Sequence, residues 1–298
     1  MRSLIAAVAG LAFTGVFAVP AQATPPGGAY WRVETVLTMT HPRPVGSGYW
    51  LTERQGSTNW KTPEGKGWFG SRPLGARPKT KKDEAAWRAD GSPKSWNYRT
   101  EGMKISLSTE PGEAHVGPQK GGPEGFHLGR KFLTYQQLQN LPSDPAALKE
   151  YVVADVKSWI GEAAEEAKTT SPNSKIDDWL SRLDSYVAID LSRMLYETPV
   201  PPKVRSAAFQ ALKTTKGVTD LGQAKDLLGR TGQKLALPTN TIKGTVLKRQ
   251  LIVDTKTMTL LAEYTDTTVD GKPFLAKTKV ETYKAGWTDE KPAVPDGK

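Results

Sequence analysis

The chain has 298 residues and a net charge of +10, with 37% hydrophobic and 8% aromatic residues, which is typical of a globular protein with a polar surface. It contains no cysteine, which excludes disulfide bonds, thiol catalysis and lipidation on cysteine. The 28 glycines and 22 prolines indicate many turns between short elements.

The first 23 residues have the pattern of a secretory signal. Arg2 precedes an apolar run over residues 4–19, Pro20 ends that run, and Ala21-Gln22-Ala23 has the small-x-small form that signal peptidase accepts. The run is shorter than the roughly 20 residues that a membrane span needs. We therefore predict a Sec-type signal cleaved after Ala23 and a secreted protein without a stable membrane anchor; the alternative is an uncleaved anchor.

The remaining residues predict strands, then helices, then strands again. We expect a flexible leader over residues 24–29, a single α+β domain over 30–290 and a polar tail over 291–298. Within the domain, N-terminal strands, a loop, helices and C-terminal strands are expected in the ranges 30–110, 110–130, 145–214 and 218–287. This order favours a curved antiparallel sheet, a half-barrel, packed on an inserted group of about three helices.

The N-terminal strands are predicted from alternating polarity. Trp31, Val33, Leu37 and Met39 share one face of a strand over residues 30–39. Further short strands are predicted at 48–55, 57–62, 67–71 and 105–108. Glycine, proline and charge favour long loops over 72–82 and 110–125, and residues 83–88 favour one helical turn.

The helices are predicted from a change of period. Asp144 as N-cap and Pro145 at the first helical position begin the first helix. Apolar residues then recur at spacings of three and four in the ranges 148–163, 176–195 and 204–212. Strand patterns return at 218–223, 233–237, 245–254, 259–265 and 274–283, and Asp270-Gly271 predicts a hairpin turn.

Several short motifs, in their order along the chain, resemble an uncharacterised family of actinobacterial secreted or membrane-anchored proteins. The motifs lie at residues 86–87, 91–93, 141–148, 217–218, 229–232, 251–254 and 286–289. The resemblance implies no activity and no catalytic residues. By analogy of fold it implies the half-barrel of the lipoprotein-carrier group (LolA, LppX and the sensor RseB), in which a curved sheet wraps helices and can leave an apolar cavity.

Tryptophans and basic residues form the best candidate for a ligand surface. Six of the nine tryptophans lie within residues 31–96, and residues 31–100 hold more than twice as many basic as acidic side chains. The rings of a sheet face can stack on sugars or line an apolar pocket, while cations hold anionic groups. The candidate ligand-binding residues are Trp50, Trp60, Trp68, Arg54 and Lys61; the alternative for the rings is core filling.

Two acidic residues interrupt the apolar faces of predicted helices. Asp155 and Asp190 could form an acid/base pair or hold a polar ligand, or each could be satisfied by an Arg or Tyr neighbour. His41, His115 and His127, with Glu113 and Glu124, lie in or beside predicted loops without helical ligand spacing, so we predict no metal site. No serine motif of a hydrolase occurs, and no cofactor is predicted.

Three functions remain open. The preferred one is a non-enzymatic extracytoplasmic protein that binds a hydrophobic or envelope-derived ligand, or senses the envelope through a partner. The second is a secreted hydrolase that acts on cell-wall polymer with Asp or Glu side chains. The third is a basic module that docks on anionic cell wall, for which simple solubility also explains the charge. Nucleic acid is not an expected partner because no binding module is present.

Overall fold

The computed structural model describes residues 27–100, 102–121, 123–170, 179–242, 244–274 and 278–295. The predicted signal over 1–23, residues 24–26 of the leader, the predicted helix break at 171–174 and residues 296–298 of the tail lie outside these ranges. Within them, no helix combines the length and the apolar character needed to cross a membrane.

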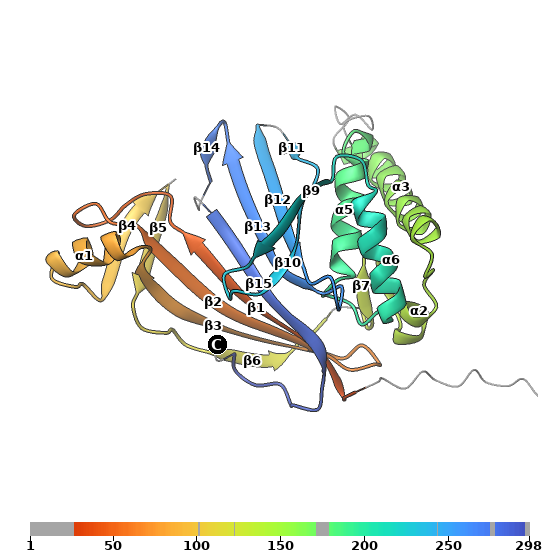
Figure 1. Ribbon diagram of the computed structural model, residues 1–298, viewed down its shortest axis with the longest axis horizontal. Helices are drawn as coiled ribbons and strands as arrows, with labels where there is room; N and C mark the ends of the chain where they lie inside the picture. Colours follow the sequence, from red (N-terminus) through yellow and green to blue (C-terminus); the bar gives the residue numbers. More distant parts are fainter. Residues whose placement is uncertain are drawn as a thin grey trace, which may run out of the picture.

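The fold is α+β, as predicted, and its main element is a large curved antiparallel sheet (Figure 1). Across the described residues the sheet has 11 strands in the order β6-β3-β2-β1-β15-β13-β12-β10-β9, with β11 on β12 and β14 on β13. These strands are β1 (Tyr30–Thr40), β2 (Leu51–Lys61), β3 (Gly67–Pro78), β6 (His115–Pro118), β9 (Thr219–Lys225), β10 (Thr231–Ala236), β11 (Asn240–Ile242), β12 (Thr245–Val253), β13 (Leu260–Val269), β14 (Lys272–Pro273) and β15 (Thr278–Thr288). The edge strands β6 and β9 do not pair with each other in the described chain, so the sheet stays open.

The first and last long strands meet in the middle of the sheet. β1 pairs with β15 along its whole length, from Tyr30 opposite Thr288 to Thr40 opposite Thr278. This pairing joins the N-terminal and C-terminal strand groups into one surface. We call the face that carries Trp31 and Leu251 the inner face, because both are buried in the main core, and the opposite face the outer face.

The N-terminal strands are longer than predicted. Residues 48–55 and 57–62 were expected as two strands, but one strand, β2, runs through both ranges. The loop expected over 72–82 is also wrong in its first part, because β3 continues to Pro78 past a bulge at Gly75, where φ is +85°. Pro73 is tolerated because its backbone faces away from β2, where its carbonyl accepts from the Gly112 amide, and β6 pairs with β3 only at Trp68–Ser71.

Small hairpins occupy much of the region between the N-terminal strands and the helices. Helix α1 (Lys81–Ala89) packs with the hairpin of β4 (Ser95–Thr100) and β5 (Met103–Ser108) at the end of the sheet far from the helix group (Figure 1). The predicted loop over 110–125 contains β6, and neither the hairpin of β7 (Phe126–Leu128) and β8 (Lys131–Leu133) nor the short helix α2 (Tyr135–Gln139) was predicted. These elements are too short to show a period.

In the described part of the helix insert, the long helices are α3 (Pro145–Thr170), α5 (Leu183–Arg193) and α6 (Pro202–Lys213). The predicted cap is confirmed, since the Ala147 amide donates to Asp144 Oδ1 at 2.9 Å. Most of the predicted apolar positions are buried; α3 contributes Leu148, Val152, Val156 and Ile160 to the core. Leu180 of the predicted face over 176–195 is instead 42% exposed, and Ile176 lies outside the described residues. The helices cover the part of the inner face formed by β10 and the adjacent ends of β12, β13 and β15 (Figure 1).

Candidate functional site

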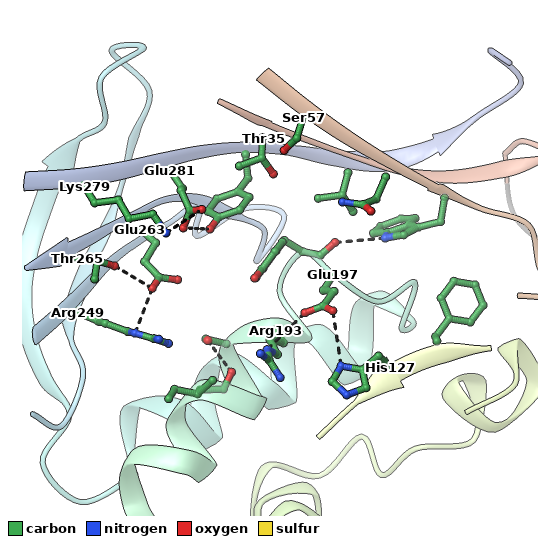
Figure 2. Close-up of a pocket in the computed structure, with 18 of the residues that line it drawn as sticks. Thr35, Ser57, His127, Arg193, Glu197, Arg249, Glu263, Thr265, Lys279 and Glu281 are labelled. Atoms are coloured by element: carbon green, nitrogen blue, oxygen red, sulfur yellow. Dashed lines mark hydrogen bonds and ion pairs between the residues drawn. The ribbon is translucent and has the colours of Figure 1, made fainter. Parts of the chain in front are cut away.

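A cavity of about 710 Å³ lies between the inner face of the sheet and the C-terminal half of α5. Strands β1, β2, β12, β13 and β15 form its floor, the end of α5 and the residues just after it form a wall, and β7 contributes to one end (Figure 2). Its volume lies in the range of small-molecule binding sites. Unlike the neighbouring core, most of its lining side chains are polar or charged.

Strand register places four charged residues side by side on the cavity floor. Glu263 of β13 is the cross-strand partner of Glu281 of β15. Two residues further along β13, Thr265 pairs with Lys279 on one side and with Arg249 of β12 on the other. A row of two carboxylates therefore lies beside a row of two cations, and we call Arg249, Glu263, Lys279 and Glu281 the charge quartet.

Ion pairs offset the repulsion between the two carboxylates of the quartet. Arg249 Nε lies 3.4 Å from Glu263 Oε1, and Lys279 Nζ lies 3.3 Å from Glu281 Oε1. Like charges directly opposite each other on a sheet are destabilising, so each glutamate needs its own cation. The quartet thus has equal numbers of acidic and basic groups and carries hydrogen-bond donors and acceptors at fixed positions (Figure 2).

Burial affects how easily Glu263 of the quartet ionises. Desolvation raises the pKa of Glu263 above its ordinary value, the charge of Glu281 adds to this effect, and Arg249 opposes it. The Thr265 hydroxyl also donates to Glu263 Oε1 at 3.3 Å and favours the ionised form. Since the pKa is raised overall, desolvation outweighs these opposing interactions and makes the Glu263 carboxyl harder to ionise.

Two tyrosines line the cavity beside the quartet. The rings of Tyr196 and Tyr283 lie 4.4 Å apart between centroids, and the Tyr283 hydroxyl donates to Glu281 Oε2 at 3.2 Å. Burial raises the pKa of both phenols, which therefore remain neutral hydrogen-bonding groups at physiological pH. The Trp31 indole donates to the Tyr196 carbonyl at 3.2 Å and holds the segment after α5 against β1.

The opposite end of the cavity is basic. Lys61 Nζ donates to the Gly125 carbonyl, and desolvation lowers the pKa of its amine, while the charge of Glu197 opposes this shift. A Cβ atom on Gly65 would lie 2.0 Å from the Gly125 amide nitrogen, so only glycine lets the β2–β3 turn approach the loop that holds Lys61. Turn and loop together fix the position of the Lys61 amine.

Glu197 lies at this end among several basic groups. Arg193 Nε lies 3.5 Å from Glu197 Oε2, and His127 Nδ1 lies 3.9 Å from Glu197 Oε1 (Figure 2). Arg193 also pairs with Asp190 at 3.7 Å, outside the cavity lining. We call Lys61, His127, Arg193 and Glu197 the basic end, because a lysine, an arginine and a histidine face one carboxylate there.

Neutral polar side chains complete the floor between the two ends. Thr35 and Ser57 are cross-strand partners on β1 and β2, and Asn59 and Thr267 line the same cavity. Hydroxyl and amide groups both donate and accept hydrogen bonds. The floor can therefore bond a ligand that itself carries both donors and acceptors.

The two predicted helix aspartates come together, but outside the cavity. Asp155 and Asp190 converge on Gly129 in the β7–β8 turn. A Cβ atom added to Gly129, whose φ is +61°, would lie 2.5 Å from Asp155 Oδ2 and 3.2 Å from Asp190 Oδ2. Lys131 Nζ lies 2.6 Å from Asp155 Oδ1, while the nearest cation of Asp190, Arg193, lies 3.7 Å away and burial raises the pKa of the Asp190 carboxyl. Among the described residues neither aspartate lines the cavity, so this geometry favours a structural role for both at the β7–β8 turn.

The predicted tryptophan surface is divided between several places. Lys61 lines the cavity on the inner face. Trp60 and Trp68 are cross-strand partners, and Trp60, only 4% exposed, lines a small hollow on the outer face with residues 293–295 of the predicted tail. Arg54 also lies on the outer face of β2. The Trp50 amide donates to Asp83 of α1 at 2.9 Å. These five residues do not form one ligand surface.

The histidines do not form a metal centre in the described residues, which contain no group of three or more metal-ligating side chains. His41 is 5% exposed and bonds the Tyr98 hydroxyl at 2.8 Å, near the α1 end of the sheet. His115 lies on β6, and His127 contacts Glu197 at the basic end. The three histidines lie on different elements.

Sequence reasoning missed the charge quartet. A signal was present, because β13 changes from Leu260-Leu261-Ala262 to a run of charged and hydroxyl residues over 263–268. A strand that is buried on one face normally keeps apolar residues at every second position. The loss of that alternation marks where the helix cover ends.

Searches against family models and curated proteins find no match for this chain. The assignment of function therefore rests on the geometry of the cavity.

Proposed function

We propose that this protein is a non-enzymatic extracytoplasmic binding protein that holds a polar ligand in the cavity between sheet and α5. The observation that carries the proposal is the charge quartet, a set of half-buried charges on the floor of a cavity sized for a small molecule. Removing such charges from water is costly unless polar partners replace the water. A ligand with matching donors and acceptors provides those partners.

The polar floor changes the kind of ligand that we expect. A hydrophobic ligand was predicted by analogy with half-barrels that enclose an apolar cavity. An acyl chain placed over Arg249, Glu263 and Lys279 would strip water from charged groups and replace none of their hydrogen bonds. An envelope-derived polar ligand keeps the predicted binding role and fits the observed lining.

Titration calorimetry with a soluble, sized extract of cell-wall fragments tests the proposal. Lys279→Met removes one cation of the quartet, and we expect at least a tenfold loss of affinity, as for a lost hydrogen bond to a charged group. Lys248→Met is the matched control, because Lys248 is exposed on the outer face of β12, next to Arg249 in sequence. Equal affinity of both variants and the parent protein would contradict the proposal.

A hydrolase that acts on cell-wall polymer is the second candidate, favoured by the pairing of Glu263 with Glu281. The two carboxyls are adjacent, yet burial raises the pKa of Glu263 while Glu281 accepts from Tyr283 and contacts Lys279. Neighbouring carboxyls in different environments can divide the roles of acid and nucleophile in glycoside hydrolysis.

Release of reducing ends from purified wall polymer distinguishes the two candidates. Hydrolysis by the parent protein that is lost in Glu263→Gln and Glu281→Gln, but kept in Asp266→Asn on the outer face of β13, would establish the hydrolase and overturn the non-enzymatic proposal. We expect no release of reducing ends by any of the four proteins, and binding by the parent protein and by Asp266→Asn.

A further inference from the structure

We infer that the ligand is a saccharide that carries one anionic group, a carboxylate or a phosphate, with the anion at the basic end and the hydroxyls over the charge quartet. This inference rests on the proposed function and specifies the ligand class of the same cavity. Three features of the lining lead to it: the paired charges of the quartet, the hydroxyl-bearing floor and the Lys61 amine at the basic end, which bonds the neutral Gly125 carbonyl.

The quartet favours hydroxyl groups over a charged ligand group. Each carboxylate of the quartet already has a cation at 3.3 or 3.4 Å. The quartet therefore has no unpaired charge for a ligand ion to neutralise. It still offers carboxylate acceptors beside guanidinium and ammonium donors. Neighbouring hydroxyls of a sugar both donate and accept, so they can bond an acidic and a basic side chain of the quartet together.

The middle of the cavity favours the same class. Thr35, Ser57 and Asn59 extend the polar floor from the quartet toward Lys61. Tyr196 and Tyr283 add neutral hydroxyls and aromatic surface beside them. A sugar ring has polar edges and apolar C–H faces, and this lining supplies partners for both. A site built to bond ligand hydroxyls strongly rejects analogues that lack them.

The basic end calls for one negative charge. Lys61 bonds a carbonyl, and no carboxylate lies within ion-pair distance of its amine among the described residues. Arg193 divides its contacts between Glu197 and Asp190, and Glu197 is the carboxylate that faces the cavity at this end. A partly desolvated ammonium group gains most from an ionised partner, and a carboxylate or phosphate of the ligand would provide it.

Calorimetry with matched small probes tests the inference. The probes are an aldobiouronic acid and its neutral disaccharide, glucose 6-phosphate and glucose, and the dipeptide alanyl-glutamate. We expect each anionic sugar to bind about tenfold or more tightly than its neutral partner, and the dipeptide not to bind. Whichever anionic sugar binds more tightly distinguishes a carboxylate from a phosphate.

Two lysine variants assign the anion to the basic end. Lys61→Met should remove the preference for the anionic member of each pair and leave the affinity for the neutral sugar unchanged. Lys66→Met, an exposed lysine in the adjacent β2–β3 turn, should keep the preference. Thermal midpoints equal to the parent value show that both variants are folded, and an unchanged preference in folded Lys61→Met overturns the assignment.

The results separate failure of this inference from failure of the proposed function. Suppose that the dipeptide binds, that Lys279→Met weakens this binding, and that no sugar binds. That result contradicts the saccharide inference but supports a polar binding site in the cavity. Failure of every probe also overturns the saccharide, while the wall-extract titration decides whether the cavity binds a polar ligand at all.

Discussion

The same face of the same strands forms both the core and the cavity. On β12, Leu251 and Val253 are fully buried under the helices, whereas Arg249, two residues before Leu251, lies in the cavity. On β13, Leu260 belongs to the core, and Glu263 and Thr265 belong to the cavity. β12 and β13 stay paired through both regions, with a bulge opposite Val253, so the difference in lining comes from what covers the strands.

The helix cover explains where one region ends. Leu191 and Leu195, in α5 and just after it, complete the core over the sheet, while Arg193 and Glu197 point into the cavity (Figure 2). The helix thus contributes to both regions over less than two turns. Because apolar burial stabilises the fold and exposed charge does not, we expect substitutions in the covered region to change stability and those in the open region to change binding.

The largest effect is expected in the covered region. Leu251→Ala should lower the free energy of unfolding by about 2–5 kcal/mol, because Leu251 is completely buried and its truncation leaves a cavity. Denaturant titration measures the loss. A change below about 1 kcal/mol would show that the helices do not pack tightly on β12 and would remove the contrast between the two regions.

A smaller loss is expected at the β7–β8 turn, where Gly129 approaches Asp155 of α3 and Asp190 of α5. Gly129→Ala should cost about 1–2 kcal/mol for the left-handed backbone, and more if the Asp155 carboxylate cannot move away from the new methyl group. Gly161→Ala, with nothing near its Cβ position on α3, should instead stabilise by up to about 1 kcal/mol. Equal effects at both glycines would contradict the close approach of the turn to the helices.

The open region should show its effect in the pH dependence of stability. Because burial raises the pKa of Glu263, the folded state binds the proton of this carboxyl more tightly than the unfolded state does. The stability that this proton contributes is fully present below the pKa of the unfolded state, and it is lost as pH rises through the pKa of the folded state. Unfolding free energies measured from about pH 4 to 8 should therefore show Glu263→Gln gaining stability relative to the parent protein as pH rises. A difference that does not change with pH would refute the raised pKa.

The smallest effect is expected on the outer face. Lys248→Met removes an exposed lysine opposite Asp266 and should change the free energy of unfolding by no more than about 0.5 kcal/mol. Denaturant titration beside Leu251→Ala measures both on one strand. A loss comparable with that of Leu251→Ala would mean that burial under the helices does not decide how much a substitution on β12 lowers the free energy of unfolding.

Long elements with a repeated apolar pattern could be predicted from the sequence, whereas short elements and strands interrupted by proline or glycine could not. The buried row from Leu148 to Ile160 and its cap at Asp144 were predicted because a long helix repeats its signal many times. The strand through Pro73 was missed because breakers were taken to end it, while a bulge at Gly75 lets pairing continue. Asp155 and Asp190 were recognised as unusual, but their shared turn at Gly129 was not predicted.

What the sequence determined by itself is the order of strands, helices and strands, the apolar faces of the helices and the α+β class, since each depends on a local period. Only the tertiary structure decided that β1 pairs with β15, which brings residues from both ends of the chain onto one cavity floor. It also decided that Lys61 faces that cavity while Trp60 lies under the tail on the other side. These outcomes depend on strand pairing between residues far apart in the chain, and no local pattern encodes which strands will meet.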